Sequence, residues 1–297
     1  MEHGMSADYY ERAFVRNLGI VSGEEQARLR ESRVAIAGLG GLGGINFVTL
    51  VRMGIGGFNI SDLDEFSIAN INRQMGATSK TAGLQKVDVM ASLARDIHPE
   101  VEIQAFPDGV HAGNIERFLT GADAVVDSID FFALEPRKLL YRTARQLGKT
   151  VVFAAPIGFS GTLHVFSPRG MSFDEYFDIR DDMSPYDQLV AFAVGLVPRG
   201  THWGYMDTRK VDLASHSGPS ISSACNIASG LLTTEVLAII LGRRSPAAAP
   251  HYVQFDPYRR IYRTGYLRWG NRGLLQRLKR WVVARRFRDQ AEAINGP

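Results

Sequence analysis

The chain of 297 residues is 45% hydrophobic and 22% charged, proportions typical of a soluble globular protein with a sizeable core. Its single cysteine, Cys225, excludes an internal disulfide and a cysteine-rich zinc site. The net charge of +3 is unevenly distributed. Eleven of the 34 lysines and arginines lie between Arg259 and Arg288, where no Asp or Glu occurs, so an acidic body carries a basic tail.

The N-terminus has no apolar run behind a basic stretch, and the longest apolar run, residues 221–241, contains Glu235. We therefore expect neither a secretion signal nor a transmembrane segment. A cytoplasmic location is the default expectation.

Residues 1–32 are polar and predict N-terminal helices with a break at 19–22. Ser22, followed three residues later by Glu25, is typical of a capping box at a helix start. The apolar run that comes next predicts a buried strand over 33–37.

A glycine-rich loop follows this strand directly and leads into an apolar segment that predicts a helix over 43–53. Glycine has no Cβ, and a helix N-terminus presents free N–H groups, so such a loop suits a phosphate. The candidate phosphate contacts are Gly38, Gly40, Gly41 and Gly43. The alternative is a turn needed only for helix–strand packing, and the loop alone does not identify the nucleotide chemistry.

Between residues 57 and 156, apolar strands alternate with amphipathic helices. The pattern predicts strands over 58–61, 101–106, 124–126 and 150–154, and helices over 83–97, 115–119 and 137–147. Such alternation is typical of right-handed βαβ crossovers, so we expect an α/β fold with a Rossmann-like, doubly wound, mainly parallel sheet. Functional residues of such a sheet lie at the carboxyl ends of its strands, where the glycine loop, residues 62–73 and Asp130 all fall.

After Pro156 the pattern changes and predicts an antiparallel extension of the sheet. Residues 161–166 alternate as a strand, 251–255 and 260–264 predict a hairpin, and 222–241 predict a long buried helix. The stretch 168–218 predicts one helix, over 186–195.

The chain therefore divides into a domain over 1–264 and a basic C-terminal extension over 265–297. Within the domain we expect N-terminal helices over 1–32, a nucleotide half over 33–156 and an acceptor half with a crossover over 157–264.

Two cations and several amides come after the second strand: Asn70, Asn72, Arg73, Gln74 and Lys86. A hydride-transfer enzyme needs no such pair of cations, whereas a nucleotidyl transferase does, because negative charge builds on the leaving pyrophosphate. Arg73 offers a planar fork and Lys86 a point charge. Taken singly, Lys86 is also explained as a solvated helix residue and Arg73 as half of a loop salt bridge.

Carboxylates complete the set. Asp62 ends the second strand and could accept hydrogen bonds from ribose hydroxyls, in this chemistry or in a dinucleotide fold, and Asp64 follows it. Asp127 and Asp130 end the fourth strand. Mg²⁺ often uses one or two protein carboxylates, and we favour Asp130 because Asp127 lies nearer the strand and its turn. The alternative for each residue is a turn aspartate.

These motifs together resemble the ThiF/MoeB/HesA superfamily, relatives of the ubiquitin-activating enzymes. The resemblance rests on GLGGLGG, DLDEFSIANINRQ, Lys86 and DSID, and it covers residues 10–241. It implies a fold that binds Mg-ATP and in which a carboxylate attacks the α-phosphate, giving an acyl-adenylate and pyrophosphate. It also implies roles for single residues: Asp62 as the ribose-binding acid, Asn70, Arg73 and Lys86 as phosphate contacts, Asp64, Asn72 and Gln74 beside them in the ATP site, and Asp130 as the Mg²⁺ ligand.

The resemblance further implies an arginine from an N-terminal helix, often supplied by a partner subunit, and hence a homodimer. Arg12 and Arg16 both qualify, and we slightly prefer Arg16. Many relatives carry two CxxC pairs for structural zinc and a cysteine in the crossover loop, and this sequence has neither. We therefore expect no zinc and adenylation without a covalent cysteine intermediate. Cys225 reads as a small buried thiol, with a nucleophile as the alternative.

The basic tail predicts a helix within 271–290 with five apolar residues on one face: Leu274, Leu275, Leu278, Trp281 and Val282. Its basic residues could bind tRNA, an acidic carrier protein or an anionic surface. The alternative is a helix docked by its apolar stripe, with the basic face in solvent.

Three functions are compatible with this sequence. The first is adenylation of the C-terminal carboxylate of a small acceptor, which could be a ubiquitin-like or sulfur-carrier protein or a peptide. The second is a tRNA-modifying dehydratase of the threonylcarbamoyladenosine type. The third, ranked last, is an NAD(P)-binding oxidoreductase or a nucleotide-binding module without catalysis.

Overall fold

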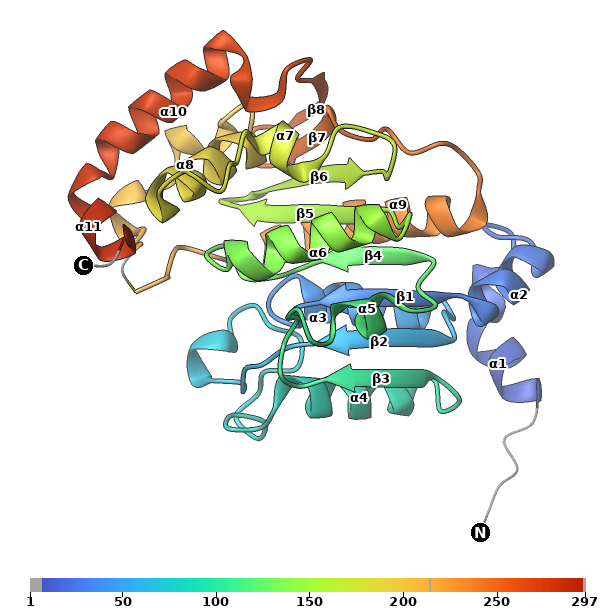
Figure 1. Ribbon diagram of the computed structural model, residues 1–297. Helices are drawn as coiled ribbons and strands as arrows, with labels where there is room; N and C mark the ends of the chain where they lie inside the picture. Colours follow the sequence, from blue (N-terminus) through green and yellow to red (C-terminus); the bar gives the residue numbers. More distant parts are fainter. Residues whose placement is uncertain (1–6, 214, 296–297) are drawn as a thin grey trace.

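The computed structural model describes residues 7–213 and 215–295, and the strands within them form one sheet in the order β3-β2-β1-β4-β5-β6-β7-β8 (Figure 1). The first five strands are parallel: β1 Arg33–Ala37, β2 Gly57–Ser61, β3 Glu102–Phe106, β4 Ala124–Asp127 and β5 Val151–Ile157. The last three are antiparallel: β6 Ser160–Phe166, β7 His251–Asp256 and β8 Ile261–Tyr266. The expected doubly wound α/β sheet with an antiparallel extension is therefore confirmed.

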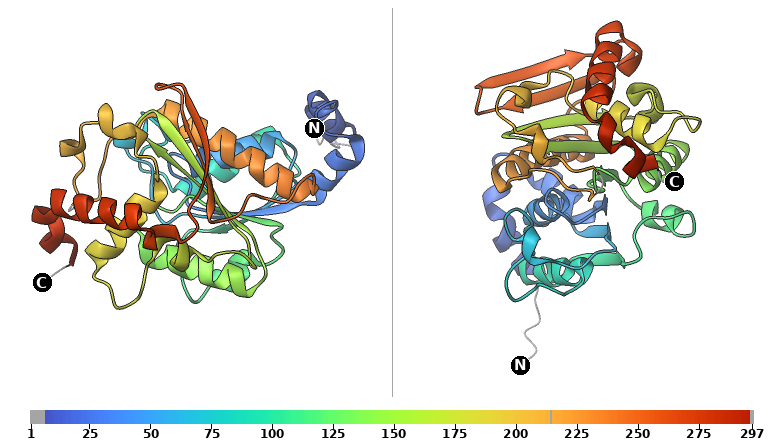
Figure 2. Two further views of the ribbon diagram at one scale, coloured as in Figure 1. Left: turned by 90° about the horizontal axis from the view of Figure 1, so that it is seen from above. Right: turned by 90° about the vertical axis from the view of Figure 1, so that its left-hand side faces the viewer.

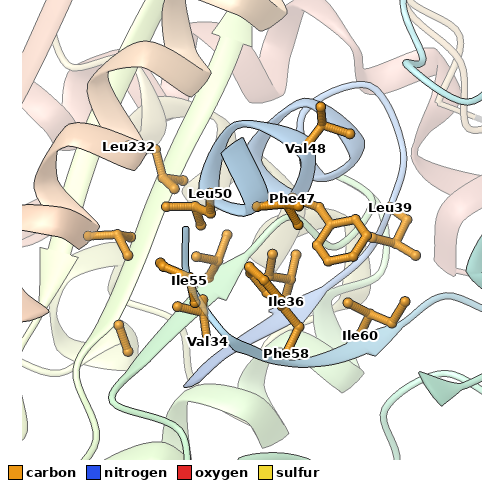
Figure 3. Packing of buried hydrophobic residues seen from close by; sticks show 14 of the residues in the cluster. Val34, Ile36, Leu39, Phe47, Val48, Leu50, Ile55, Phe58, Ile60 and Leu232 are labelled. Atoms are coloured by element: carbon orange, nitrogen blue, oxygen red, sulfur yellow. The ribbon is translucent and has the colours of Figure 1, made fainter. Parts of the chain in front are cut away.

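Helices cover both faces of the sheet (Figure 2). One face carries α3 Gly43–Arg52, α4 Lys86–Ile97 and α9 Ser222–Leu241. The other carries α5 Ile115–Leu119, α6 Leu134–Gln146, α7 Phe173–Phe177 and α8 Pro185–Leu196. The strands alternate accordingly, because successive side chains point to opposite faces. In β1, Val34 and Ile36 join the first core beside Phe47 of α3 (Figure 3), and Ala35 and Ala37 join the second.

Two N-terminal helices precede the sheet, α1 Ala7–Phe14 and α2 Gly23–Glu31. They lie at the amino ends of the strands, since Tyr10 Oη donates to the carbonyl of Gly54 at 2.6 Å, just before β2. The expected capping box is confirmed, because Ser22 Oγ accepts from Glu25 N and Glu25 Oε2 accepts from Ser22 N.

The crossover stretch contains more structure than the single helix that the sequence predicts. Besides α8, which covers the expected segment, it holds α7, which starts with a capping box of Ser172 and Glu175. Short 3₁₀ helices occur here and elsewhere in the chain: Val15–Asn17, Ile68–Asn70, Thr201–Gly204, Thr208–Lys210, Gly270–Arg272 and Arg288–Gln290.

The C-terminal extension forms α10 Leu274–Arg286 and α11 Ala291–Asn295. The alternative that α10 docks by its apolar stripe is wrong. Gln276 and Val283 face the body of the protein, whereas Leu274 is 83% exposed and Trp281 58% exposed. The apolar stripe therefore points outward.

By length and composition, α9 could cross a membrane, and it is the one such helix in the described part of the chain. Within this fold, 56% of its apolar window is buried, and the helix packs on β5, β6 and α3. Glu235 is buried within it and is paired with Arg244.

Two buried histidines make the stability of the fold depend on pH. Burial lowers the pKa of His164 from 6.5 to about 3, and burial lowers the pKa of His202 from 6.5 to about 4. Between these values and 6.5 the unfolded chain binds more protons than the folded one. The contribution of these two histidines to stability is therefore fully present above about pH 6.5 and falls below it, by about 1.4 kcal/mol per pH unit for each histidine.

We expect His164→Phe to reduce this pH dependence, because phenylalanine fits the ring cluster around His164 and does not titrate. Urea unfolding of wild type and variant at pH 7.5, 6.0 and 5.0 measures the slope. Equal slopes for the two proteins would contradict the assignment to His164.

Candidate functional site

Two loops at the carboxyl ends of β1 and β4 approach each other closely. Gly38 has a φ of +91°, and a Cβ at this position would collide with the carbonyl oxygen of Ser128. A Cβ at Gly43, the first residue of α3, would collide with the carbonyl oxygen of Gly38. Only glycine permits these approaches, which set the N-terminus of α3 beside the loop after β4. The N–H groups of this helix N-terminus lie where the sequence analysis expects a phosphate to bind.

Asp62 fastens the glycine loop to the end of β2. Its Oδ2 accepts from Leu39 N at 2.6 Å, and its Oδ1 accepts from Asp64 N at 2.9 Å. Burial raises the pKa of Asp62, while the nearby cation of Lys86 and these N–H groups oppose that shift. A carboxylate has about four lone-pair sites, so two donors leave room for a further hydrogen bond.

Lys86 is a buried cation held by two carboxylates. The side chain is 6% exposed, and its Nζ lies 2.8 Å from Asp64 Oδ2 and 3.8 Å from Asp62 Oδ1. The alternative of a solvated helix lysine is therefore wrong. A buried lysine needs such partners, because an unpaired charge is costly to take out of water.

The loop after Asp64 presents Arg73 to the glycine loop. Arg73 Nη1 donates to Asn72 Oδ1 at 2.9 Å, and the Arg73 side chain lies against Gly41, whose missing Cβ leaves room for it. Arg73 has no ion-pair partner in the described part of the chain, so the alternative of a loop salt bridge finds no support there.

The three amides of this loop have different surroundings. Asn70 Oδ1 accepts from Ser67 N, and Asn72 Nδ2 donates to the carbonyl of Ser220. Gln74 is buried beside Gly40, and its Oε1 has no hydrogen-bond partner among the described residues. Asn70 and Asn72 thus shape the loop, while Gln74 keeps an unused acceptor next to the glycines.

The two aspartates after β4 have separate environments. Asp127 is fully buried, its Oδ1 accepts from Ile129 N, and its Oδ2 accepts from Arg137 Nε at 2.8 Å. Asp130 is exposed, and its Oδ1 accepts from Phe132 N at 2.9 Å. Asp127 is therefore structural, as the sequence suggests, whereas Asp130 is an exposed carboxylate in the loop after β4.

Arg137 is the residue that sequence analysis missed. It is 1% exposed, pairs with Asp127, and also donates to the carbonyls of Ile129 and Asp130. A signal existed, because position 137 lies on the face of α6 that also carries Leu134 and Tyr141. A basic residue on a buried helix face requires a buried anion.

Cys225 lies directly against the glycine loop, since its Sγ is in contact range of Gly41. Burial raises the pKa of its thiol, opposed by Ser220 and the charge of Arg73. The thiol is buried and stays protonated near neutral pH, which fits the structural role better than that of a nucleophile.

Arg12 and Arg16 are not brought to this site within one chain. Both lie in the N-terminal segment at the amino ends of the strands, and the glycine loop lies at the carboxyl ends (Figure 1). Both side chains are exposed. No group of three or more His, Cys, Asp or Glu side chains suited to a metal ion occurs in the described ranges.

Comparison with known proteins matches residues 14–268 to the ThiF family. The tRNA threonylcarbamoyladenosine dehydratase of Haemophilus influenzae is 35% identical over 124 residues, 41% of this chain and 48% of that protein. The sulfur carrier protein adenylyltransferase of Thermus thermophilus is 33% identical over 159 residues, 54% of this chain and 57% of that protein. The chain thus spans about half the length of the curated relatives it matches.

The fold also resembles a crystal structure of the Escherichia coli tRNA N6-threonylcarbamoyladenosine dehydratase in complex with ATP. The TM-score is 0.58 at 18% identity, over 80% of this chain and 96% of that one. At that identity the similarity shows a shared fold.

We expect Arg137→Met to destabilise the protein by about 3–5 kcal/mol, because it leaves Asp127 as a buried, unpaired carboxylate. Urea unfolding measures the loss. Arg142→Met on the same helix is the matched control, since Arg142 pairs with Asp174 and Asp181 at the surface and should contribute at most about 1 kcal/mol. Equal losses in the two variants would contradict the role of Arg137.

Proposed function

This chain belongs to the ThiF family, and from that premise we propose that it is an ATP-dependent adenylyltransferase that activates a carboxylate as an acyl-adenylate. One observation carries the proposal. Contacts link the glycine loop with Asp62, Lys86 and Arg73, and Asp130 follows β4, whose next loop touches Gly38, so all of them lie at the carboxyl ends of neighbouring strands. A binding loop, two cations and a free carboxylate are what attack on a nucleotide phosphate requires.

The proposed reaction is a displacement at the α-phosphorus of ATP. An oxygen of the acceptor carboxylate forms a bond to that phosphorus, the bond to the bridging oxygen breaks, and pyrophosphate leaves with the electron pair. Arg73 and Lys86 stabilise the charge that develops on the phosphates, and N–H groups of the glycine loop orient them. Asp62 holds the loop and has spare acceptor capacity for a ribose hydroxyl.

Asp130 is the proposed ligand of Mg²⁺. Mg²⁺ in nucleotide sites usually needs only one or two protein carboxylates, so Asp130 alone would be enough to hold it. An exposed Asp130 just after β4 fits that need, and Mg²⁺ when bound would neutralise phosphate charge. Asn70, Asn72 and Gln74 support the same site, and the buried Cys225 gives no reason to add a covalent step.

The proposed acceptor is the free C-terminal carboxylate of a small protein or peptide. The dehydratase activity named for one relative is a second candidate, because it would give the exposed arginines of α10 an RNA to bind. A cytoplasmic location suits either substrate.

We also propose a homodimer, in which Arg16 or Arg12 enters the site of the partner. Exposed apolar side chains surround Arg16, namely Val15, Leu18 and Ile20. Others line the loop beside the phosphate site, namely Leu63, Ile68, Ile71, Met75 and Leu84. Contact between these two patches on neighbouring copies would cover both and bring Arg16 to the other site.

We expect Arg73→Ala and Asp130→Ala each to lower acceptor-dependent exchange of labelled pyrophosphate into ATP by at least about 100-fold, because each removes charge stabilisation at the phosphates. Lys80→Ala and Asp108→Ala are controls, since both residues are exposed and lie outside the site. Unchanged melting temperatures separate lost chemistry from lost fold. Full exchange in either variant would refute its role.

We expect subunit mixing to restore activity between two inactive homodimers. Arg16→Ala and Arg73→Ala variants, mixed in equal amounts, form heterodimers with one intact site, giving about a quarter of the wild-type exchange rate. The same mixture with Arg12→Ala identifies which arginine crosses. Wild-type exchange by the Arg16→Ala and Arg12→Ala variants alone would contradict this arrangement.

A further inference from the structure

A cavity lies near the carboxyl ends of β4 and β5. It has a volume of about 450 Å³, in the range of ligand pockets, and lies between α8, the 197–213 segment and α10. Phe131, the residue after Asp130, and Ile157, the last residue of β5, form part of its wall. The cavity therefore starts at the same edge of the sheet as the candidate adenylation site.

The wall of this cavity is apolar. Leu189, Val194 and Met206 contribute to it, and at the outer side Leu278 and Val282 of α10 do the same. Its cationic side chains are Arg199 and Lys279, among the described residues. His202 also lines it with a buried Nδ1 that has no hydrogen-bond partner in the described ranges. Such a lining selects an apolar group with a few polar contacts.

The outward stripe of α10 continues the apolar wall. Leu278 and Val282 belong both to the cavity and to the exposed stripe, which also includes Leu274, Leu275 and Trp281. Polar bonds fix the helix in this orientation. Arg280 pairs with Asp178 at 2.6 Å, and Lys279 Nζ donates to the carbonyl of Pro198 at 2.6 Å.

The charge around the stripe indicates the kind of partner. Arg277, Arg285 and Arg286 are exposed on α10 next to the apolar residues. Two copies of this chain meeting through α10 would bring these arginines together, which is unfavourable. An acidic partner with apolar side chains complements the surface in both respects.

We propose that the acceptor is an acidic peptide, or the acidic tail of a small protein, whose last residues include large apolar side chains. Those side chains fill the cavity between α8 and α10, and the acidic part lies along the arginines of α10. The terminal carboxylate extends past Phe131 toward Asp130. Adenylation of this peptide rests on the proposed adenylyltransferase function, whereas binding of the peptide to the cavity does not. A tail ending in Gly-Gly would leave the cavity unfilled.

Binding of fluorescein-labelled 12-residue peptides, measured by fluorescence anisotropy without ATP, tests the proposal. One peptide has a glutamate-rich body and ends in Leu-Leu, a second has the same body and ends in Gly-Gly, and a third ends in Leu-Leu after a lysine-rich body. We expect the first to bind at least about 10-fold more tightly than either of the others. Added salt should weaken it.

Variants of the cavity test whether the Leu-Leu peptide binds there. Ala193→Trp fills the cavity, and the double variant Leu278→Ser/Val282→Ser makes its outer wall polar at exposed positions. Each should weaken the Leu-Leu peptide by at least about 10-fold. Leu147→Ser, an exposed leucine at the end of α6, is the matched control and should leave binding unchanged. The proposal would be overturned if the Leu-Leu and Gly-Gly peptides bound equally, or if neither cavity variant weakened binding. It would also be overturned if α10 bound tRNA in place of the peptide.

Pyrophosphate exchange separates the two proposals. Tight binding of the Leu-Leu peptide without exchange would refute the adenylyltransferase function and leave the peptide site standing. Exchange that is equal with the Gly-Gly peptide would refute the peptide site and leave the function standing.

Discussion

The close approach between the glycine loop and the loop after β4 is the constraint on which the site depends. Gly38 can turn against Ser128 only because it lacks a Cβ and tolerates a positive φ. Arg137 secures the other side, since it pairs with the buried Asp127 and binds the carbonyls that follow it. The N-terminus of α3 is therefore held beside the loop that follows β4 and contains Asp130.

Charge is balanced within this space before any substrate arrives. Lys86 is buried but lies between Asp62 and Asp64, and Asp62 also binds the glycine loop. The same carboxylate thus offsets a buried cation and fixes the backbone that is proposed to hold phosphate. Preorganised charge of this kind needs little rearrangement when new charge develops nearby, which is where electrostatic catalysis gains most.

The cavity between α8 and α10 is the proposed place where the acceptor binds. α10 is held by the polar bonds of Arg280 and Lys279 and by the packing of Val283 and Ala284 against the core. Its apolar stripe is exposed, and Leu278 and Val282 of the stripe line the same cavity as Phe131. The nucleotide and the acceptor would then both bind at the carboxyl ends of the strands, where ligands bind in doubly wound sheets.

The sequence by itself determined the strands, helices and mainly parallel sheet of the nucleotide half, the glycine loop and the polar residues near it, because apolar period, glycine spacing and strand-end position are local signals. Within the site it also separated Asp127 from Asp130 by their distance from the strand. It did not reveal that Arg137 supports the loop or that Lys86 is buried between Asp62 and Asp64, nor that α10 faces its leucines outward. Those facts depend on which distant residues meet: Asp127 for Arg137, Asp62 and Asp64 for Lys86, Asp178 for Arg280. An amphipathic pattern distinguishes an apolar and a polar face of a helix, but only tertiary contacts decide which of the two is buried.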